Sequence, residues 1–536
     1  MAGIRRRTQA LIVASVVSVV SVVSLVVASA PAARAEAVTG VVQFGTPLDE
    51  RATSIALGGS PARTHLYVGG WTDGRLGGSR LAGRDAFLGR FDQTSSLVWI
   101  RQFGTDRRDE VTSVAVGDRG VYVGGTTTGA LGDGDHRGGE DGFVRRYAPD
   151  GAREWTRAFG TRRDDVVLGV AADAEGVYVA GGTRGSLSTQ RIGGWDAFLR
   201  RYDRSGRLVW ERQFGTPEAD RATAAAVSIG GVSVGGETDG ALPGASSKGG
   251  TDAFLRAYSS DGAPSWTRQI GTPEADAGTS VTALGTGIGL GGTTAGSLPG
   301  HASAGGVDGF TRTFTSDGAA VFSEQFGSPG DEAVTTLSLG FALQIAGSTD
   351  GTFPGQAGAG GLDLFSRNVD ESTGDELWAE QSGTTGNDRI LGGAGLVFDV
   401  GWIVGSTDGA FPGYENAGGE DVLLALVQPG DLQDARAMEL LTRALAAAQA
   451  YHDGNGDSYA GFSAIHGAMI DPELTWQADV PDDPQVVSVR DVGATHVLLT
   501  TLSSSGRYSC IVGDAGSTGP QGMSEAPFTT VADCTG

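Results

Sequence analysis

Cysteine and histidine are scarce in this sequence of 536 residues, and each shortage excludes a class of site. The two cysteines, Cys510 and Cys534, have no second Cys/His couple beside them, which disfavours a zinc site. The six histidines are scattered, and no two of them stand at metal-binding spacing. The sequence also contains no Gly-x-Ser-x-Gly motif, so the nucleophile elbow of hydrolases is excluded.

Positive charge is scarce as well. Lys248 is the only lysine, and the formal net charge is −24. Such a field repels nucleic acid and anionic membranes, so neither is expected as a partner. An acidic surface that keeps the protein in solution explains the same charge without any ligand.

Long apolar runs are confined to the N-terminus. Arg5-Arg6-Arg7 precedes an apolar stretch over residues 11–27, and Ala33-Arg34-Ala35 has the small-x-small pattern of a cleavage site. These features predict a secretory signal peptide over residues 1–35, and hence a secreted or cell-surface protein. An uncleaved anchor is the alternative, because the stretch approaches the length of a membrane span. In an exported chain, an isolated pair of cysteines favours one disulfide, here between Cys510 and Cys534.

Glycine, by contrast, is abundant, and it recurs at fixed positions in a repeated phrase. The phrase reads Trp99-Ile-Arg-Gln-Phe-Gly-Thr105 in its first intact copy, and Val41-Val-Gln-Phe-Gly-Thr46 is a headless copy near the N-terminus. Successive marker glycines are 59, 56, 55, 56, 56 and 56 residues apart, which indicates a repeat architecture. The seven markers are Gly45, Gly104, Gly160, Gly215, Gly271, Gly327 and Gly383.

Each repeat predicts four short strands bounded by glycine, aspartate, proline or serine. The strand of the tryptophan type, with Phe322 in one copy, occurs only six times inside the array, and the headless N-terminal copy supplies the seventh. If this N-terminal strand completes the last unit, 28 strands form a closed ring without exposed sheet edges. The sequence therefore predicts an all-β, seven-bladed propeller over residues 36–428, in which the N-terminal strand closes the last blade.

The repeats resemble the bacterial β-propeller repeats of the SBBP type. Asp196-Ala-Phe198, Asp203-Arg-Ser-Gly206, Trp210 and Val234-Gly-Gly-Glu-Thr238 follow the order of that repeat. The resemblance covers about residues 38–427 and implies a propeller and export, but no uniform activity. The last units depart from the pattern, since Phe322 replaces tryptophan and Ser382 replaces phenylalanine.

An acidic residue stands five positions after every marker glycine. In a closed propeller these equivalent positions form a ring, and seven carboxylates could bind a cation such as Ca²⁺. The alternative is that each acid accepts backbone N–H bonds in its own turn. The seven candidate binding residues are Glu50, Asp109, Asp165, Asp220, Asp276, Glu332 and Asp388.

A second repeated aspartate opens the third strand of each unit, and an Asx-type turn explains it locally. The repeated tryptophans are interpreted as core between sheets, because large aromatic side chains dominate such packing. A platform on which sugars stack is the alternative, and it would require exposed rings. The second set of acids is Asp85, Asp141, Asp196, Asp252, Asp308, Asp363 and Asp421.

The pattern changes at Pro429-Gly430, and residues 429–536 predict a small α+β domain. Leu441, Leu445 and Ala448 lie at helical spacing, and strand-like runs follow. The segment resembles the soluble half of type IV pilin-like and pseudopilin subunits, through Ala444–Tyr451, Asn455–Tyr459 and Ser505–Cys510. The resemblance implies a C-terminal disulfide loop, but the pilin membrane helix and its processing site are absent. Residues 453–457 resemble the start of a calcium loop without its later glycine and glutamate.

The sequence thus predicts a fold more firmly than an activity. The leading interpretation is a secreted or cell-surface, non-catalytic binding or adhesion protein, monomeric, whose propeller loops contact an extracellular protein or glycan. No cofactor is expected apart from the possible Ca²⁺. An extracellular lyase or hydrolase that uses the propeller channel, and a structural surface spacer, are the alternatives.

Overall fold

The computed structural model describes most of residues 38–427 and parts of 441–524. Within the first range the gaps are residues 61–62, 78–81, 133–135, 189–190, 229, 286, 340–341 and 396–400. In the second range, the described residues are 441, 444–445, 447–452, 458–460, 462–470, 475–477, 486–492, 496–502, 508–514 and 517–524. The predicted signal peptide therefore lies outside the described residues.

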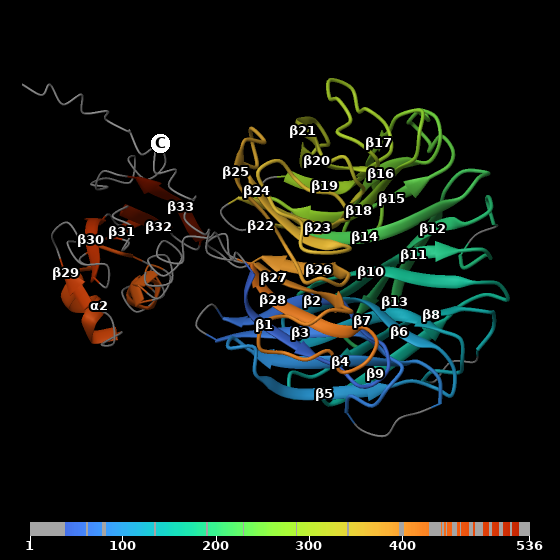
Figure 1. Cartoon of the computed structure of the whole chain (residues 1–536), viewed down its shortest axis with the longest axis horizontal. Helices are drawn as coiled ribbons and strands as arrows, with labels where there is room; N and C mark the ends of the chain where they lie inside the picture. The colour runs from blue at the N-terminus through green and yellow to red at the C-terminus, as the bar shows by residue number, and fades with distance from the viewer. Residues whose placement is uncertain are drawn as a thin grey trace, which may run out of the picture. The chain divides into compact units, whose positions relative to one another are not determined.

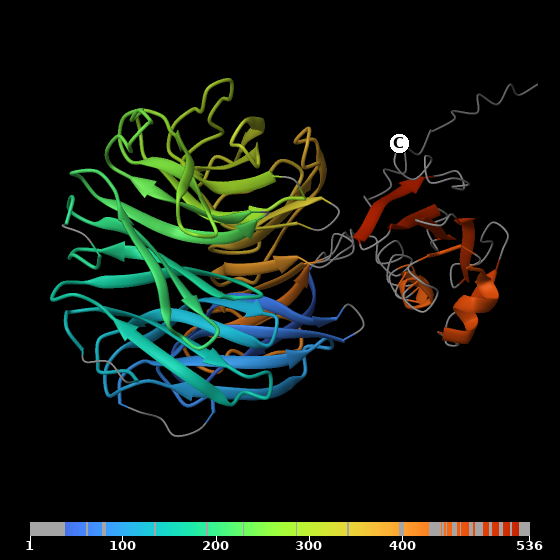
Figure 2. The same ribbon diagram turned by 180° about the vertical axis from the view of Figure 1, so that it is seen from behind.

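Residues 38–427 form seven sheets of four antiparallel strands arranged in a ring, as the repeat predicted (Figures 1 and 2). The first two blades are β2 (Glu50–Ser60), β3 (Arg63–Thr72), β4 (Asp85–Asp92), β5 (Leu97–Phe103), and β6 (Asp109–Gly117), β7 (Gly120–Thr127), β8 (Asp141–Tyr147), β9 (Arg153–Phe159). Blades 3 and 4 are β10 (Asp165–Asp173), β11 (Gly176–Thr183), β12 (Asp196–Asp203), β13 (Leu208–Phe214), and β14 (Asp220–Ser228), β15 (Gly231–Thr238), β16 (Asp252–Ser259), β17 (Pro264–Ile270).

The remaining blades repeat the same order. Blades 5 and 6 are β18 (Asp276–Ala283), β19 (Gly287–Thr294), β20 (Asp308–Thr315), β21 (Ala320–Phe326), and β22 (Glu332–Leu339), β23 (Leu343–Thr349), β24 (Asp363–Val369), β25 (Glu376–Ser382). Blade 7 contains β26 (Asp388–Gly395), β27 (Gly401–Thr407) and β28 (Asp421–Val427), and its fourth strand is β1 (Val38–Phe44). β1 pairs antiparallel with β28, with Phe44 opposite Val422, so the predicted closure of the ring is confirmed.

The first strand of each blade is the innermost, and neighbouring first strands contact one another. Every first strand carries a β-bulge, between Ala52 and Ser54 in blade 1. At the bulge, the Thr53 hydroxyl donates a hydrogen bond to the carbonyl of Val111 in blade 2 (2.6 Å). The amide of Val114 in turn donates to the Ser54 hydroxyl oxygen (3.0 Å). The bulges therefore turn side chains toward the next blade and link the strands around the centre of the ring.

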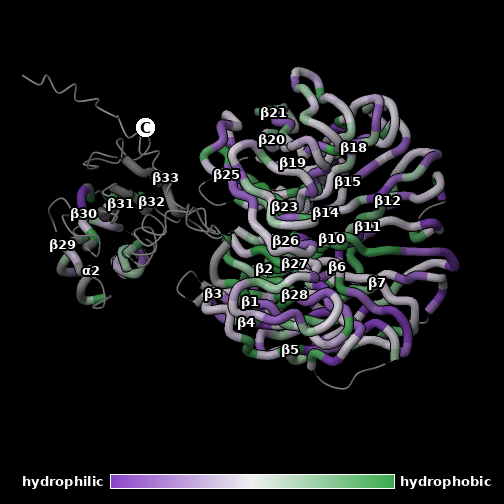
Figure 3. Tube along the Cα trace, in the orientation of Figure 1, coloured by the Kyte–Doolittle hydropathy of each residue, from purple (hydrophilic) through white to green (hydrophobic). Residues whose placement is uncertain are grey.

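The core lies between neighbouring sheets. One buried cluster joins Tyr67 and Leu88 of blade 1 to Val111, Val123 and Phe143 of blade 2. Hydrophobic stretches follow the strands of the ring and hydrophilic ones are frequent in its loops (Figure 3). Burial of apolar surface between blades is therefore what holds the ring together.

The repeated tryptophans are half-buried on the outermost strands, and four of them pack on a turn of the next blade. The Trp99 indole nitrogen donates to the carbonyl of Pro149 (3.3 Å), and the ring packs on Gly151 in the turn between β8 and β9. Gly151 has a φ of +82°, and a methyl group there would lie 3.0 Å from the Trp99 ring. Glycine is thus required by both the turn and the ring that covers it. The same contact joins Trp155 to Gly206, Trp210 to Gly262 and Trp266 to Gly318.

The described residues beyond 441 form a helix-and-sheet unit, as predicted for an α+β fold. β29 (Thr475–Gln477), β30 (Val486–Val492), β31 (His496–Leu502), β32 (Tyr508–Asp514) and β33 (Ser517–Ser524) form one sheet, and α2 (Ala464–Ile470) precedes it. Leu441, Leu445 and Ala448 are helical, buried and packed with Val487 and Leu499, so the predicted helical stripe faces the sheet.

Two predictions for this C-terminal part are not tested. Cys510 is buried on β32, but Cys534 lies outside the described residues, so their disulfide stays a prediction. The residues of the calcium-like loop, 453–457, also lie outside the described residues. Across the described chain, no helix is long and apolar enough to cross a membrane.

Candidate functional site

Two sets of connections share one end of the ring. Strands alternate in direction within a blade, so the loop from the second to the third strand emerges beside the connection into the next blade. Backbone hydrogen bonds join the two sets, from Thr128 to Arg108 (2.8 Å) and from Gly250 to Pro273 (3.0 Å). We call this surface the loop face. Both predicted sets of acids lie directly beneath it, because they start the first and third strands.

The first set of acids is buried, and each carboxylate accepts hydrogen bonds from side chains and backbone at its own junction between blades. All seven residues of this set are at most 2% exposed. Asp220 accepts hydrogen bonds from the Thr216 amide (2.6 Å) and hydroxyl (3.1 Å), where Thr216 follows the marker glycine. The hydroxyl of Thr238, at the end of the second strand, donates to the other oxygen of Asp220 (2.5 Å). The geometry favours the alternative given above, in which each acid serves its own turn.

The marker glycine is explained by the two acids that flank it. A methyl group on Gly271 would lie 1.9 Å from Oδ1 of Asp252 and 3.1 Å from Oδ2 of Asp276. Two carboxylates from neighbouring blades therefore occupy the space that any larger residue would need. The equivalent pair in the next junction, Asp308 and Glu332, flanks Gly327 in the same way.

Six of these buried carboxyls have a pKa that differs from that of an exposed carboxyl. Burial is the largest influence and raises the pKa of six of the seven, and the charge of the partner aspartate raises it further. Hydrogen bonds from threonine or serine partly oppose the shift. The six are Glu50, Asp165, Asp220, Asp276, Glu332 and Asp388.

A cation at this ring stays a prediction of the sequence. Among the residues that the structure describes, no three His, Cys, Asp or Glu side chains gather closely enough to hold a metal ion. The hydrogen-bond donors around Asp220 and Asp276 also point at the carboxylate oxygens that a cation would need.

The repeated glutamine is a structural residue that the sequence interpretation missed. The Gln269 amide donates to Asp252 (2.6 Å) and to the carbonyl of Gly240 (2.8 Å). Its oxygen accepts the amide of Leu242 (3.1 Å), whose side chain is buried under the loop. Each loop is thereby fixed to the blade below it. The signal was available, because glutamine stands two residues before the marker glycine in six of the seven copies.

Blade 2 replaces this arrangement. Ala158 stands where the other copies have glutamine, and His136 from the loop itself approaches Asp141, with Nδ1 3.0 Å from Oδ2. A histidine of the loop thus takes the place of the glutamine of the outer strand.

The fixed loops present variable side chains. In blades 4 to 7 a Leu or Phe, buried in blades 4, 5 and 7 and half-buried in blade 6, is followed by Pro-Gly, and the glycine has a φ between +77° and +87°. The amide after the glycine donates back to this Leu or Phe, as from His301 to Leu298 (2.9 Å), which closes a type II turn. The residues that follow these glycines are Ala245, His301, Gln356 and Tyr414.

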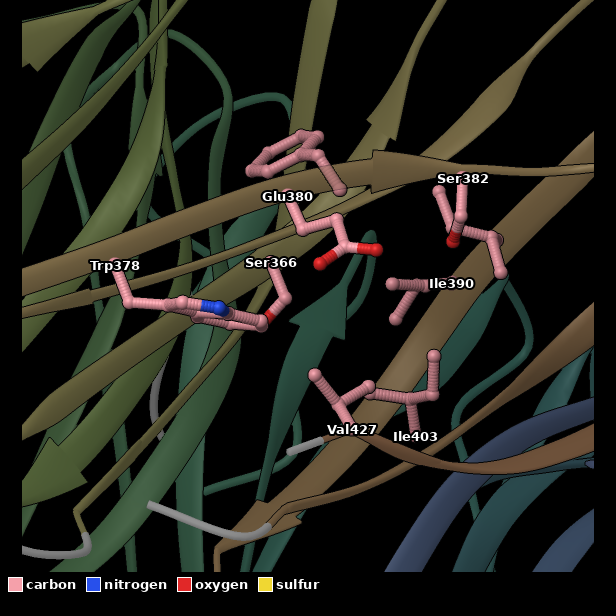
Figure 4. A pocket seen from close by; sticks show the side chains of 9 residues that line it. Ser366, Trp378, Glu380, Ser382, Ile390, Ile403 and Val427 are labelled. Atoms are coloured by element: carbon pink, nitrogen blue, oxygen red, sulfur yellow. The ribbon is translucent and has the colours of Figure 1, made fainter. Parts of the chain in front are cut away.

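The junction between blades 6 and 7 differs from the others and contains a small pocket. Ser382 and Val427 line it together with Trp378, Glu380 and Ile390. Figure 4 shows the Glu380 carboxylate and the Trp378 indole pointing toward the apolar side of this pocket. The pocket lies where other junctions have larger side chains.

Comparison with known proteins assigns no family to this chain, and no family model matches it. The chain is 26% identical over 392 residues to a protein named Regulatory protein FlaEY of Caulobacter vibrioides; the match spans 68% of this chain but only 37% of that protein. Similar solved structures include the Pan2 WD40 domain of Neurospora crassa (TM-score 0.42, 12% identity, 72% of this chain and 95% of that one). A Bacteroides caccae protein of unknown function is another (TM-score 0.31, 12% identity, 59% and 93%).

Proposed function

We propose that the protein is a secreted or cell-surface binding protein, without catalytic activity, that contacts a protein ligand through the loop face. One observation carries the proposal: repeated side chains fix the loops to the blades, whereas the residues at the loop tips differ from blade to blade. Gln269, Asp252 and Leu242 fix one loop, and equivalent residues fix the loops of the other blades except blade 2. The residues after Pro-Gly in blades 4 to 7 differ. Rigid loops that differ only at their tips are typical of binding surfaces.

A protein ligand is favoured over a glycan by the exposed side chains. Leu48, Ile192 and Tyr414 are exposed on the loop face, at 41%, 44% and 36%. Apolar and tyrosine side chains of this kind suit protein interfaces. Four of the five repeated tryptophans that a sugar platform would use are instead packed on glycine turns of the next blade. The relative named above is called a regulatory protein, which fits a module that acts by binding another protein.

We propose no reaction for the propeller. A lyase or hydrolase would draw its acids from the first set, and those carboxylates are buried and hydrogen-bonded in their turns. The same proposal includes export directed by residues 1–35 and membership of the SBBP type for the repeats. It also includes a docking role for the pilin-like C-terminal part.

The test is a binding screen of the full mature chain against surface proteins and glycans of its source. Binding should be lost in the double variant His301→Ala, Tyr414→Ala, which removes two loop tips. It should persist in Arg119→Gln, a change in the turn between β6 and β7 at the opposite end of the blade. Binding that survives the tip variant but not the control would contradict the proposal, and binding only to glycans would replace its ligand class.

A further inference from the structure

The loop face is divided by charge into two sectors. The described loop and connection residues over blades 1 to 3, residues 73–77, 82–84, 104–108, 128–132, 136–140, 160–164, 184–188 and 191–195, form what we call the arginine sector. Among their described residues, one acid is exposed, Asp106, against eight exposed arginines. These are Arg75, Arg107, Arg108, Arg137, Arg162, Arg163, Arg184 and Arg191.

The rest of the loop face is acidic. It comprises residues 215–219, 239–251, 271–275, 295–307, 327–331, 350–362, 383–387, 408–420 and 45–49, and Lys248 is its one exposed lysine or arginine. The exposed acids of this acidic sector are Asp49, Glu218, Asp239, Glu274, Asp331, Asp350, Asp408 and Glu415.

The division is clear at a single repeat position. Three residues after the marker glycine stand Arg107 and Arg163 in the arginine sector, and Glu218 and Glu274 in the acidic sector. The backbone of the repeat is the same at these four sites, so the fold itself does not require either charge. The reversal therefore concerns what each sector contacts.

Half of the eight exposed arginines have no ion pair or side-chain hydrogen bond with the described residues. Arg108 pairs with Glu110 (2.8 Å) and Glu140 (3.4 Å), and Arg184 pairs with Asp164 (3.2 Å). Arg191 donates one hydrogen bond to the carbonyl of Gly194 (3.4 Å). Four others have no ion pair or side-chain hydrogen bond with any described residue, namely Arg107, Arg137, Arg162 and Arg163. In a protein of net charge −24, a sector of unpaired guanidinium groups is the natural contact for carboxylates, which they bind through paired N–H donors.

We propose that the arginine sector binds an acidic segment of a protein partner, rich in aspartate or glutamate. This inference rests on the proposed function and names the chemistry of its ligand. Two observations favour a short acidic segment over a longer polyanion. Nucleic acid or an anionic membrane would extend from the arginine sector over Glu218, Glu274 and Asp331, which repel it. Ile192, 44% exposed beside Arg191, also offers an apolar contact that a phosphate chain would not use.

The experiment uses a fluorescent oligo-glutamate peptide and the full mature chain, with anisotropy measured at low and high salt. The peptide should bind, and binding should weaken as salt screens the contact. The triple variant Arg107→Gln, Arg162→Gln, Arg163→Gln should weaken binding by at least roughly tenfold, as several exposed ion pairs are lost.

The matched control carries the same loss of charge at the opposite end of the same blades. Arg119, Arg153 and Arg207 are exposed there, and the triple change of these residues to glutamine should alter affinity by less than about twofold. Unchanged melting temperatures would show that both triple variants fold.

Four results would overturn the inference: no binding of the peptide, equal weakening in both triple variants, tighter binding of heparin or duplex DNA than of the peptide, or self-association of the chain at low salt that the arginine variant abolishes. None of these results touches the tips His301 and Tyr414, which test the proposed function separately.

Discussion

The junction between blades 6 and 7 is built from the same repeat as the regular junctions between blades, but different side chains pack inside it. Between blades 2 and 3, Phe159 lies against Tyr202, and the Arg200 guanidinium sits 3.9 Å from the Phe159 ring centre. Between blades 6 and 7, Ser382, Val427 and Ala425 occupy the three equivalent positions. Three large side chains have become small, and the small pocket beside Trp378 results.

The turn that covers each tryptophan is also missing there. Trp155 and Trp210 each pack on a glycine turn that joins the third and fourth strands of the next blade. Blade 7 has no such turn, because its fourth strand comes from the N-terminus.

At the next junction, between blades 7 and 1, the tryptophan is missing as well as the glycine of the turn. The outer strand of blade 7 has Gly40 at the position of the repeated tryptophan, and the turn of blade 1 has Ser95 at a φ of 61° where blades 2 to 6 have glycine. At both of these junctions the usual packing of a tryptophan on a glycine turn of the next blade is therefore absent.

The largest effect is expected at the marker glycine. Gly271→Ala should destabilise the propeller by about 3–5 kcal/mol, because the methyl group would collide with Asp252 between two buried carboxylates. Gly285→Ala is the control, since nothing lies within 4 Å of a methyl group at that site. Denaturant unfolding of the two variants measures the difference. Equal stabilities of the two variants would show that the two carboxylates do not exclude a larger residue at position 271.

The tryptophans should reveal the next effect. Trp210→Ala should cost about 2–4 kcal/mol, because it empties a regular junction and uncovers the turn at Gly262. Trp378→Ala should cost clearly less, because no turn lies over that ring. Thermal unfolding of both variants tests the comparison. It would be contradicted if Trp378→Ala proved the more damaging change.

Filling the exceptional junction should give a smaller gain. The double variant Ser382→Phe, Val427→Tyr restores the side chains of the regular junctions and should stabilise the chain by about 1 kcal/mol. The reciprocal change Phe214→Ser should destabilise by about 3 kcal/mol. A loss of stability on filling would mean that the pocket beside Trp378 does not accept the regular packing.

The smallest expected effect concerns pH. A carboxyl whose pKa is raised by folding holds its proton more tightly in the folded state, so its contribution to stability is complete below its unfolded pKa, about 4, and is lost as pH rises through the folded pKa. Six buried carboxyls share this direction. The melting temperature should therefore be higher at pH 5 than at pH 7.5, by a few degrees. Calorimetry tests this, and Asp220→Asn should reduce the difference.

The sequence predicted the ring because the repeat count carries topological information. Six internal tryptophan strands and one headless copy leave a single closed arrangement, and β1 against β28 is that arrangement. The candidate site was less accessible. The structural use of Gln269 depends on a loop 27 residues earlier, and the division into charge sectors appears only when loops far apart in sequence share one face. Net charge, which is a sum, conceals such a division.

The central claim is that the N-terminal strand closes the propeller, and hydrogen exchange of its backbone amides tests it most directly. In the intact mature chain, the amides of β1 that pair with β28 should exchange about as slowly as those of β5, the corresponding outer strand of blade 1. Exchange of β1 at the rate of an unstructured peptide, with β28 exposed as well, would contradict the closed ring.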